Sequence, residues 1–300
     1  MGAFLGQPAT WRPVATLAHT IVRAEGKTPT RSLLFLHGIL GTRANWRGIA
    51  RRLVDERPEL SVVLVDLRGH GDSLGMPGPS TIEQAARDLR TLEAVLETPV
   101  RGVLGHSFGG KVAMQYALDR ADPLDTLFVI DSSPGRELSP DSHGGEPETP
   151  RIQETAHILR TLRQLHFPMA TREDFVAAIE AAGLSRPIAL WLAMNLRRMA
   201  DGRRDFPLDL DEVENLLASY YATDTWAAVE RPRGRGHVHM IVGGLSPVLT
   251  PADLARVKLA SREHDAVHLH VIPEANHWVH VDAPDALHEL LLLGTRNLGR

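Results

Sequence analysis

A pentapeptide near the middle of the chain, Gly-His-Ser-Phe-Gly at residues 105–109, constrains the fold more than any other feature. It follows a short apolar run at residues 103–104 and precedes residues 110–117, whose composition predicts a helix. Strand, sharp turn and helix are the setting in which a G-x-S-x-G turn exposes its serine at the carboxyl end of a strand. The amide of Phe108 then lies at a helix start, which favours an anion. Ser107 is therefore predicted to be a nucleophile.

Short apolar runs alternate with helical patterns through most of the chain. The predicted strands, in chain order, are residues 33–36, 62–65, 103–104, 126–130, 240–242 and 269–272. The predicted helices between them include residues 46–53, 81–96 and 111–118. Residues 14–23 are expected to add an antiparallel pair at one edge. This alternation is typical of an α/β fold, in which a mostly parallel sheet has helices on both faces.

The alternation stops between about residues 135 and 226. Residues 133–150 are rich in serine, proline, glycine and acidic residues, which predicts an irregular loop. Four helical patterns follow, at residues 151–165, 172–182, 187–199 and 210–218. We interpret this region as a helical cap inserted at the carboxyl edge of the sheet. The predicted domains are therefore a core formed by residues 1–134 and 227–300, and a cap, or lid, formed by residues 135–226.

Composition excludes several classes of protein. The 300 residues carry a formal net charge of −4, which argues against nucleic-acid or membrane-surface binding. The absence of cysteine excludes disulfides, thiolate nucleophiles and cysteine metal sites. No apolar stretch approaches the length of a membrane span, and residues 1–13 lack the pattern of a secretion signal. We expect a soluble cytoplasmic protein that is a monomer or a homodimer.

A serine nucleophile needs a base, a group that orients the base, and amide donors for the developing oxyanion. In an open α/β sheet these groups meet at the carboxyl ends of the strands, so each should follow a strand. His277 follows the last predicted strand and is the predicted base, with His280 as a minor alternative. The turn at residues 36–41 follows the first strand, and the backbone N–H of Ile39 is expected to join that of Phe108 in an oxyanion hole.

The orienting acid has two candidates. The loop after residues 240–242 contains no carboxylate before Asp253. Asp253 lies three residues after Thr250, with proline at the first helical position, so helix capping is sufficient to explain it. Asp131 directly ends the strand 126–130, which we expect to lie beside the strand that bears Ser107. We assign Asp131 as the acid and keep Asp253 as the alternative.

Other side chains are assigned with less support from the pattern. The acyl pocket is expected to be lined by Leu40, Trp191, Met194, Trp226 and Trp278. Four arginines in the insertion favour a solvated face, with recognition of a substrate carboxylate as the alternative: Arg197, Arg198, Arg203 and Arg204. Histidines at alternate positions in two late strands could bind a metal, but they lack a carboxylate companion: His237, His239, His268 and His270. We predict no metal site.

These motifs together resemble the α/β-hydrolase fold superfamily. They are, in order, the H-G-x-x-G turn at 37–41, the segment 66–73, the elbow at 105–110 and the N-H-W-V-H string at 276–280. The match covers roughly residues 30–134 and 236–290. It implies a mostly parallel eight-stranded sheet flanked by helices, a helical cap after strand six, and no cofactor.

The resemblance also bears on the acid. Most of the superfamily carries its acid after the seventh strand, where this chain has Ser246. The string Asp-Ser-Ser-Pro at residues 131–134 is similar to a branch of small esterases and abhydrolase-domain proteins. In that branch the aspartate after strand six completes the triad, which implies the same role for Asp131.

The hypothesis that accounts for these features best is a serine carboxylesterase. It would cleave ester, or thioester, bonds of small to medium acyl substrates through Ser107, His277 and Asp131 and an acyl-enzyme. Carbon–carbon bond hydrolases or lyases and perhydrolases use the same triad and remain alternatives. A non-catalytic receptor for small ligands on the same fold is an alternative of another class. The expected partner is a small-molecule acyl ester, without nucleic acid or membrane insertion.

Overall fold

The computed structural model describes residues 16–137, 150–296 and 298. The described residues form one large sheet with the strand order β1-β3-β2-β4-β5-β8-β9. Its strands are β1 (His19–Val22), β2 (Arg31–Leu36), β3 (Leu60–Val65), β4 (Val100–His106), β5 (Thr126–Ile130), β8 (His237–Gly243) and β9 (Val267–Ile272). Within the described part of this sheet, only β1 is antiparallel to its neighbour, and the other strands pair in parallel. The predicted α/β-hydrolase fold is confirmed.

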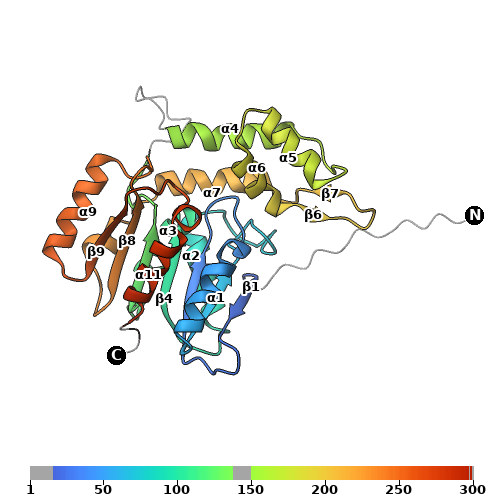
Figure 1. The fold of residues 1–300 in the computed structure, drawn as a ribbon. Helices are drawn as coiled ribbons and strands as arrows, with labels where there is room; N and C mark the ends of the chain where they lie inside the picture. The colour runs from blue at the N-terminus through green and yellow to red at the C-terminus, as the bar shows by residue number, and fades with distance from the viewer. Residues whose placement is uncertain (1–15, 138–149, 297, 299–300) are drawn as a thin grey trace, which may run out of the picture.

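Helices cover both faces of this sheet (Figure 1). They are η1 (Arg43–Trp46), α1 (Arg47–Glu56), α2 (Ile82–Glu93), α3 (Phe108–Asp119), α9 (Pro251–Glu263), α10 (Val279–Asp282) and α11 (Pro284–Gly294). Successive side chains of a strand point to opposite faces. In β2, Leu33 and Phe35 pack with α1 and α11, whereas Leu34 and Leu36 pack with α2 and α3. Burial on both faces explains why the central parallel strands β2, β3, β4 and β5 are largely apolar.

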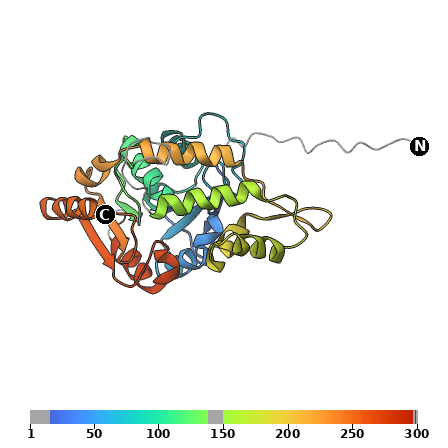
Figure 2. The same cartoon turned by 90° about the horizontal axis from the view of Figure 1, so that it is seen from above.

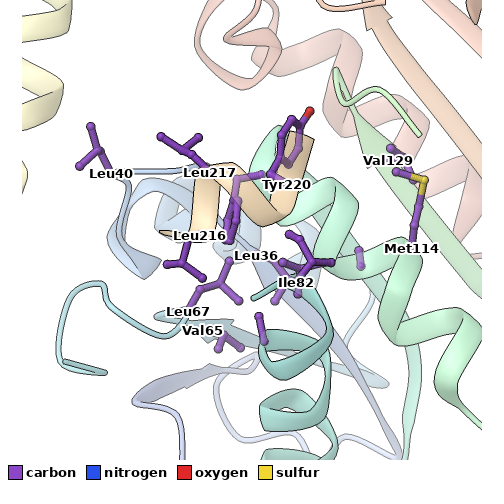
Figure 3. Packing of buried hydrophobic residues seen from close by; sticks show 14 of the residues in the cluster. Leu36, Leu40, Val65, Leu67, Ile82, Met114, Val129, Leu216, Leu217 and Tyr220 are labelled. Carbon is purple, nitrogen blue, oxygen red and sulfur yellow. The ribbon is translucent and has the colours of Figure 1, made fainter. Parts of the chain in front are cut away.

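The segment between β5 and β8 lies across the carboxyl ends of the strands (Figures 1 and 2). We call residues 150–230 the inserted segment. It consists of α4 (Pro150–Gln164), α5 (Arg172–Ala181), α6 (Arg186–Leu192), η2 (Ala193–Asn195), β6 (Arg197–Arg198), β7 (Arg204–Asp205), α7 (Leu210–Ala222) and α8 (Trp226–Glu230). In Figure 3, Leu216, Leu217 and Tyr220 of α7 lie over Leu36 and Ile82. The inserted segment therefore shares one hydrophobic core with the sheet.

Three expectations about the elements need correction or restriction. The predicted helix 187–199 ends early, because α6 and η2 stop at Asn195 and the next residues form β6, which pairs with β7. The large sheet has seven strands among the described residues where eight were expected, since only β1 forms at the edge where residues 14–23 were expected to give a pair. Most of the loop expected at 133–150, and residues 1–13, lie outside the described residues.

No helix among the described residues combines the length and the apolar character that crossing a bilayer requires.

Candidate functional site

Ser107 lies at a sharp turn between β4 and α3. Its backbone has φ 53° and ψ −118°, which is a strained conformation for a residue with a Cβ atom. Its N–H donates to the carbonyl oxygen of Ile130 at 2.9 Å, which ties the turn to the end of β5. Phe108 is the first residue of α3, so no preceding turn of that helix accepts its N–H. The turn therefore presents a hydroxyl and a backbone donor at one edge of the sheet.

The glycines of the elbow allow a close approach between backbones. A Cβ atom at Gly105 would lie 2.0 Å from the carbonyl oxygen of Gly109, and a Cβ atom at Gly109 would lie 2.4 Å from that of His37. Neither contact is tolerable for a larger residue. The two glycines of the G-x-S-x-G pattern are therefore needed for packing, because they allow the turn at residues 37–41 to lie directly against the elbow.

Asp131 and His277 form a hydrogen-bonded pair beside this turn. His277 Nδ1 lies 2.7 Å from Asp131 Oδ2, and a carboxylate only accepts, so Nδ1 is the donor. Nε2 of a neutral imidazole is then left as an acceptor. Asp131 is fully buried and directly follows β5, whereas the His277 side chain is 26% exposed. A backbone φ of 45° turns Asp131 out of the strand direction.

Two further groups hold the Asp131 carboxylate. Gly243 N–H donates to Oδ1 at 3.2 Å, and the Ser246 hydroxyl donates to Oδ2 at 2.5 Å. Sequence reasoning treated Ser246 only as the missing acid after β8 and did not find this contact. The position of Ser246 could have indicated the contact, because a residue that follows β8 lies at the same edge of the sheet as Asp131. Asp253 instead closes a capping box with Thr250 at the start of α9 and makes no recorded contact with His277 in the described residues.

Ser107 and His277 line the same cavity, which has a volume of about 330 Å³. No hydrogen bond between the Ser107 hydroxyl and His277 is present in the described residues, and such bonds in free enzymes often form only when the substrate binds. The lining is largely apolar. The apolar side chains from the inserted segment, the loop after β9 and α10 include Ile158, Ile188, Leu190, Trp191, Met194, Leu217, Trp278 and Val281.

The structure places two of the five expected pocket residues elsewhere. Trp191, Met194 and Trp278 line the cavity, but Leu40 and Trp226 do not. Leu40 is fully buried in the turn after β2, where both of its backbone polar groups are hydrogen-bonded. Trp226 is buried at the start of α8, and the guanidinium carbon of Arg256 lies 4.0 Å from the centre of its ring.

The turn at residues 37–41 carries the second expected oxyanion donor. Ile39 lines the cavity together with Gly38 and Phe108. Neither Ile39 N–H nor Phe108 N–H donates a recorded hydrogen bond within the described residues, so both can serve a ligand oxygen. The arrangement therefore offers a hydroxyl, an imidazole and two backbone donors around one apolar cavity.

Two neutral histidines pack around His277. His106 Nε2 donates to the His277 carbonyl oxygen at 2.8 Å, and the rings of His106 and His280 lie 4.9 Å apart. Burial, with a smaller contribution from the nearby His277, lowers the pKa of His280 to about 4 and that of His106 well below its usual value of 6.5. Near pH 7 these two rings are therefore uncharged.

The arginine and histidine clusters lie away from the cavity. Arg197 donates to Asp72 Oδ1 at 2.7 Å, Arg203 pairs with Asp201, and no arginine or lysine is among the described residues that line the cavity. The four strand histidines are hydrogen-bonded in two pairs, His237 with His268 at 2.9 Å and His239 with His270 at 3.1 Å, and their rings also stack across the pairs. Among residues 16–137, 150–296 and 298, no group of three or more ligating side chains is arranged to hold a metal ion.

Comparisons with known proteins agree with this architecture. Residues 33–290 match the family described as "Alpha/beta hydrolase family". The mouse protein "sn-1-specific diacylglycerol lipase ABHD11" is 28% identical over 276 residues, which is 92% of this chain and 83% of the relative. "Esterase YbfF" of Escherichia coli (strain K12) is 26% identical over 266 residues, covering 88% of this chain and 92% of the relative.

A solved structure shows the same fold. The "Marine microorganism esterase" superposes with a TM-score of 0.74 at 23% identity, covering 94% of this chain and 100% of that chain.

Proposed function

The chain belongs to the alpha/beta hydrolase family, and we propose that it is a serine hydrolase that cleaves carboxylic esters of small to medium acyl groups. The observation that carries this proposal is the pair of His277 Nδ1 and Asp131 Oδ2, 2.7 Å apart, at the cavity that Ser107 also lines. The names of the mouse lipase and the E. coli esterase support it, because those relatives match most of this chain.

The proposed mechanism follows from the roles of these atoms. The Ser107 hydroxyl attacks the acyl carbonyl while His277 Nε2 accepts its proton. His277 then returns the proton to the leaving alcohol, and Asp131 holds the ring in the Nδ1–H tautomer throughout. The N–H groups of Ile39 and Phe108 stabilise the oxyanion of each tetrahedral intermediate. Water, deprotonated by His277, then releases the acid from the acyl-enzyme.

The cavity supports an uncharged acyl group as the substrate. Its volume of about 330 Å³ lies at the small end of ligand pockets, and tryptophan, methionine and aliphatic side chains form most of its wall. A thioester with the same acyl group would react by the same steps, and so would a perhydrolase reaction in which peroxide replaces water.

Carbon–carbon bond hydrolases, which commonly act on acidic substrates, receive less support. Such a substrate would need a cationic partner. Apart from histidines, Glu154 is the charged residue among the described residues that line the cavity, and its carboxylate would repel an acidic substrate. The arginines that could have recognised a carboxylate lie elsewhere, with Arg197 bound to Asp72. A non-catalytic receptor for small ligands would not need the Ser107 hydroxyl or the hydrogen-bonded pair of His277 and Asp131.

The test is a series of p-nitrophenyl esters from acetate to octanoate, with the Ser107→Ala variant as control. We expect hydrolysis by the wild-type protein and none above background by the variant. A matched pair of five-carbon esters, p-nitrophenyl valerate and the p-nitrophenyl half-ester of glutaric acid, tests the charge argument. We expect the neutral ester to react faster. Negligible rates across the whole series would contradict esterase activity and favour carbon–carbon cleavage or the receptor.

A further inference from the structure

The orientation of the Ile39 N–H depends on the carbonyl group of Gly38. The two belong to one trans peptide, so they point in opposite directions. The Gly38 oxygen accepts from His37 Nδ1 at 2.8 Å and from Gly41 N–H at 3.0 Å. As long as Gly41 keeps its place, these two bonds fix the orientation of the peptide group that carries the Ile39 N–H.

The position of Gly41 depends in turn on Leu40. Leu40 has φ 58°, in the left-handed region that a leucine avoids unless its surroundings impose it. Its N–H donates to His70 Nε2 at 2.9 Å, and its carbonyl oxygen accepts from Asn195 Nδ2 at 2.8 Å. His70 can accept because its Nδ1–H is donated to the Arg68 carbonyl oxygen at 2.9 Å. The strained residue is therefore held from both sides.

The holding groups come from different parts of the chain. His70 follows β3 in the core, whereas Asn195 ends η2 in the inserted segment. Asn195 is buried, and its Nδ2 also donates to the Leu192 carbonyl oxygen at 3.2 Å, which fixes the direction of the amide. The preceding residue, Met194, lines the cavity. Asn195 therefore connects the cavity wall at Met194, which would contact an acyl group, to the turn that carries the Ile39 N–H.

We propose that Asn195 is a positioning residue, through which the inserted segment holds the Leu40 carbonyl group and so keeps the Ile39 N–H aimed at the oxyanion. This inference rests on the proposed function, because it concerns the geometry of that site. Asn195 touches neither Ser107 nor His277 through any recorded hydrogen bond in the described residues. Its effect would therefore be on the transition state, in which the oxyanion is formed, and little on substrate binding.

The test compares Asn195→Ala with Arg197→Ala. Both variants remove a contact between the inserted segment and the core, but Arg197 bonds Asp72 and Gly71 rather than the oxyanion turn. Loss of a direct oxyanion donor reduces kcat by about 10²–10³, so loss of its support should reduce kcat by about tenfold. We expect this in Asn195→Ala, with KM changed less than about twofold, and near wild-type values in Arg197→Ala.

Inhibitor binding separates positioning from a general structural effect. A boronic acid that forms a tetrahedral adduct with Ser107 should bind Asn195→Ala about tenfold more weakly, whereas an unreactive alcohol of the same shape should bind equally. Asn195→Leu keeps the approximate size of the side chain without its donor and serves if the alanine variant does not fold. Equal weakening of both inhibitors, or equal kcat losses in the two alanine variants, would overturn the proposal.

The same experiment distinguishes this inference from the proposed function. Wild-type protein that hydrolyses esters, with Asn195→Ala and Asn195→Leu equally active, would leave the esterase proposal in place and refute the role of Asn195. A wild-type protein that neither hydrolyses esters nor binds the boronic acid would refute both.

Discussion

At the scale of single residues, backbone strain is concentrated in the candidate site. The non-glycine residues with positive φ among the described residues are Leu40, Ser107 and Asp131, and all three lie in or directly support it. Each such conformation costs on the order of 1–3 kcal/mol and persists only where the surroundings impose it. Each of the three residues is held by a hydrogen bond. Leu40 N–H donates to His70, Ser107 N–H donates to Ile130, and Asp131 accepts from Ser246.

The role of Asp131 can be separated from that of Asp253 by matched substitutions. Asp131→Asn keeps the shape of the side chain but presents an amide that favours the wrong tautomer of His277. In a serine triad this change lowers turnover by about 10⁴. Asp253→Asn changes only the capping box at the start of α9 and should leave kcat near the wild-type value. Both are measured as kcat on a p-nitrophenyl ester; a large loss in Asp253→Asn with little in Asp131→Asn would reverse the assignment.

At the scale of elements, most of the sheet and its edge could be predicted from the sequence. Buried parallel strands are largely apolar, so most of β2, β3, β5 and β8 could be recognised as apolar runs. The edge strand β9 is mostly half-buried and carries two histidines, and only its residues 269–272 were predicted. The expectation that Ser107, Asp131 and His277 lie at one edge follows from the rule that ligands of such sheets bind at the carboxyl ends of the strands.

What could not be predicted depends on contacts between distant residues. The helix predicted for 187–199 has a helix-forming composition, but Asn195 bonds Leu192 and Leu40, and the chain then turns into β6. Leucine gives no local signal for the left-handed conformation of Leu40. The contact between Ser246 and Asp131 joins residues 115 positions apart, so no local pattern could show it.

A buried lysine joins α3 to the inserted segment, and we predict that its loss lowers the stability of the fold. Lys111 Nζ donates to the carbonyl oxygens of Gly135 at 2.6 Å, Tyr220 at 2.8 Å and Thr223 at 3.3 Å. Lys111→Met would leave these acceptors without their charged donor, which should lower the free energy of unfolding by about 1–3 kcal/mol. The exposed Lys258→Met is the matched control. Urea midpoints measured by circular dichroism should fall for Lys111→Met alone; equal midpoints would contradict the role.

At the scale of the whole molecule, the core contains several histidines that are held neutral. Burial is the main cause, and it lowers the pKa of His37 and His280 to about 4 and that of His70 and His239 to about 3, from the usual 6.5. Since their folded-state pKa values are depressed, the unfolded chain binds more protons than the folded protein below about pH 6.5. Stability is therefore greatest above that pH and declines as the pH falls toward 4.

This predicts acid sensitivity of the fold itself. Well below pH 6.5, each such histidine reduces the free energy of unfolding by about 1.4 kcal/mol per pH unit. Denaturant midpoints at pH 7.5 and pH 5 should therefore differ clearly, with the lower midpoint at pH 5. His239→Phe removes one of these groups and should narrow the difference. Equal wild-type midpoints at the two pH values would show that these histidines are not held neutral in the folded protein.

The central claim is that the hydroxyl at residue 107 is activated by His277, and labelling with a fluorophosphonate tests it most directly. The rate of adduct formation would be followed by peptide mass spectrometry in the wild-type protein and in His277→Gln. The proposed mechanism predicts one adduct, on Ser107, whose rate falls by at least about 10³ in the variant. An unlabelled Ser107 in a protein that still hydrolyses esters, or equal labelling in the two proteins, would contradict it.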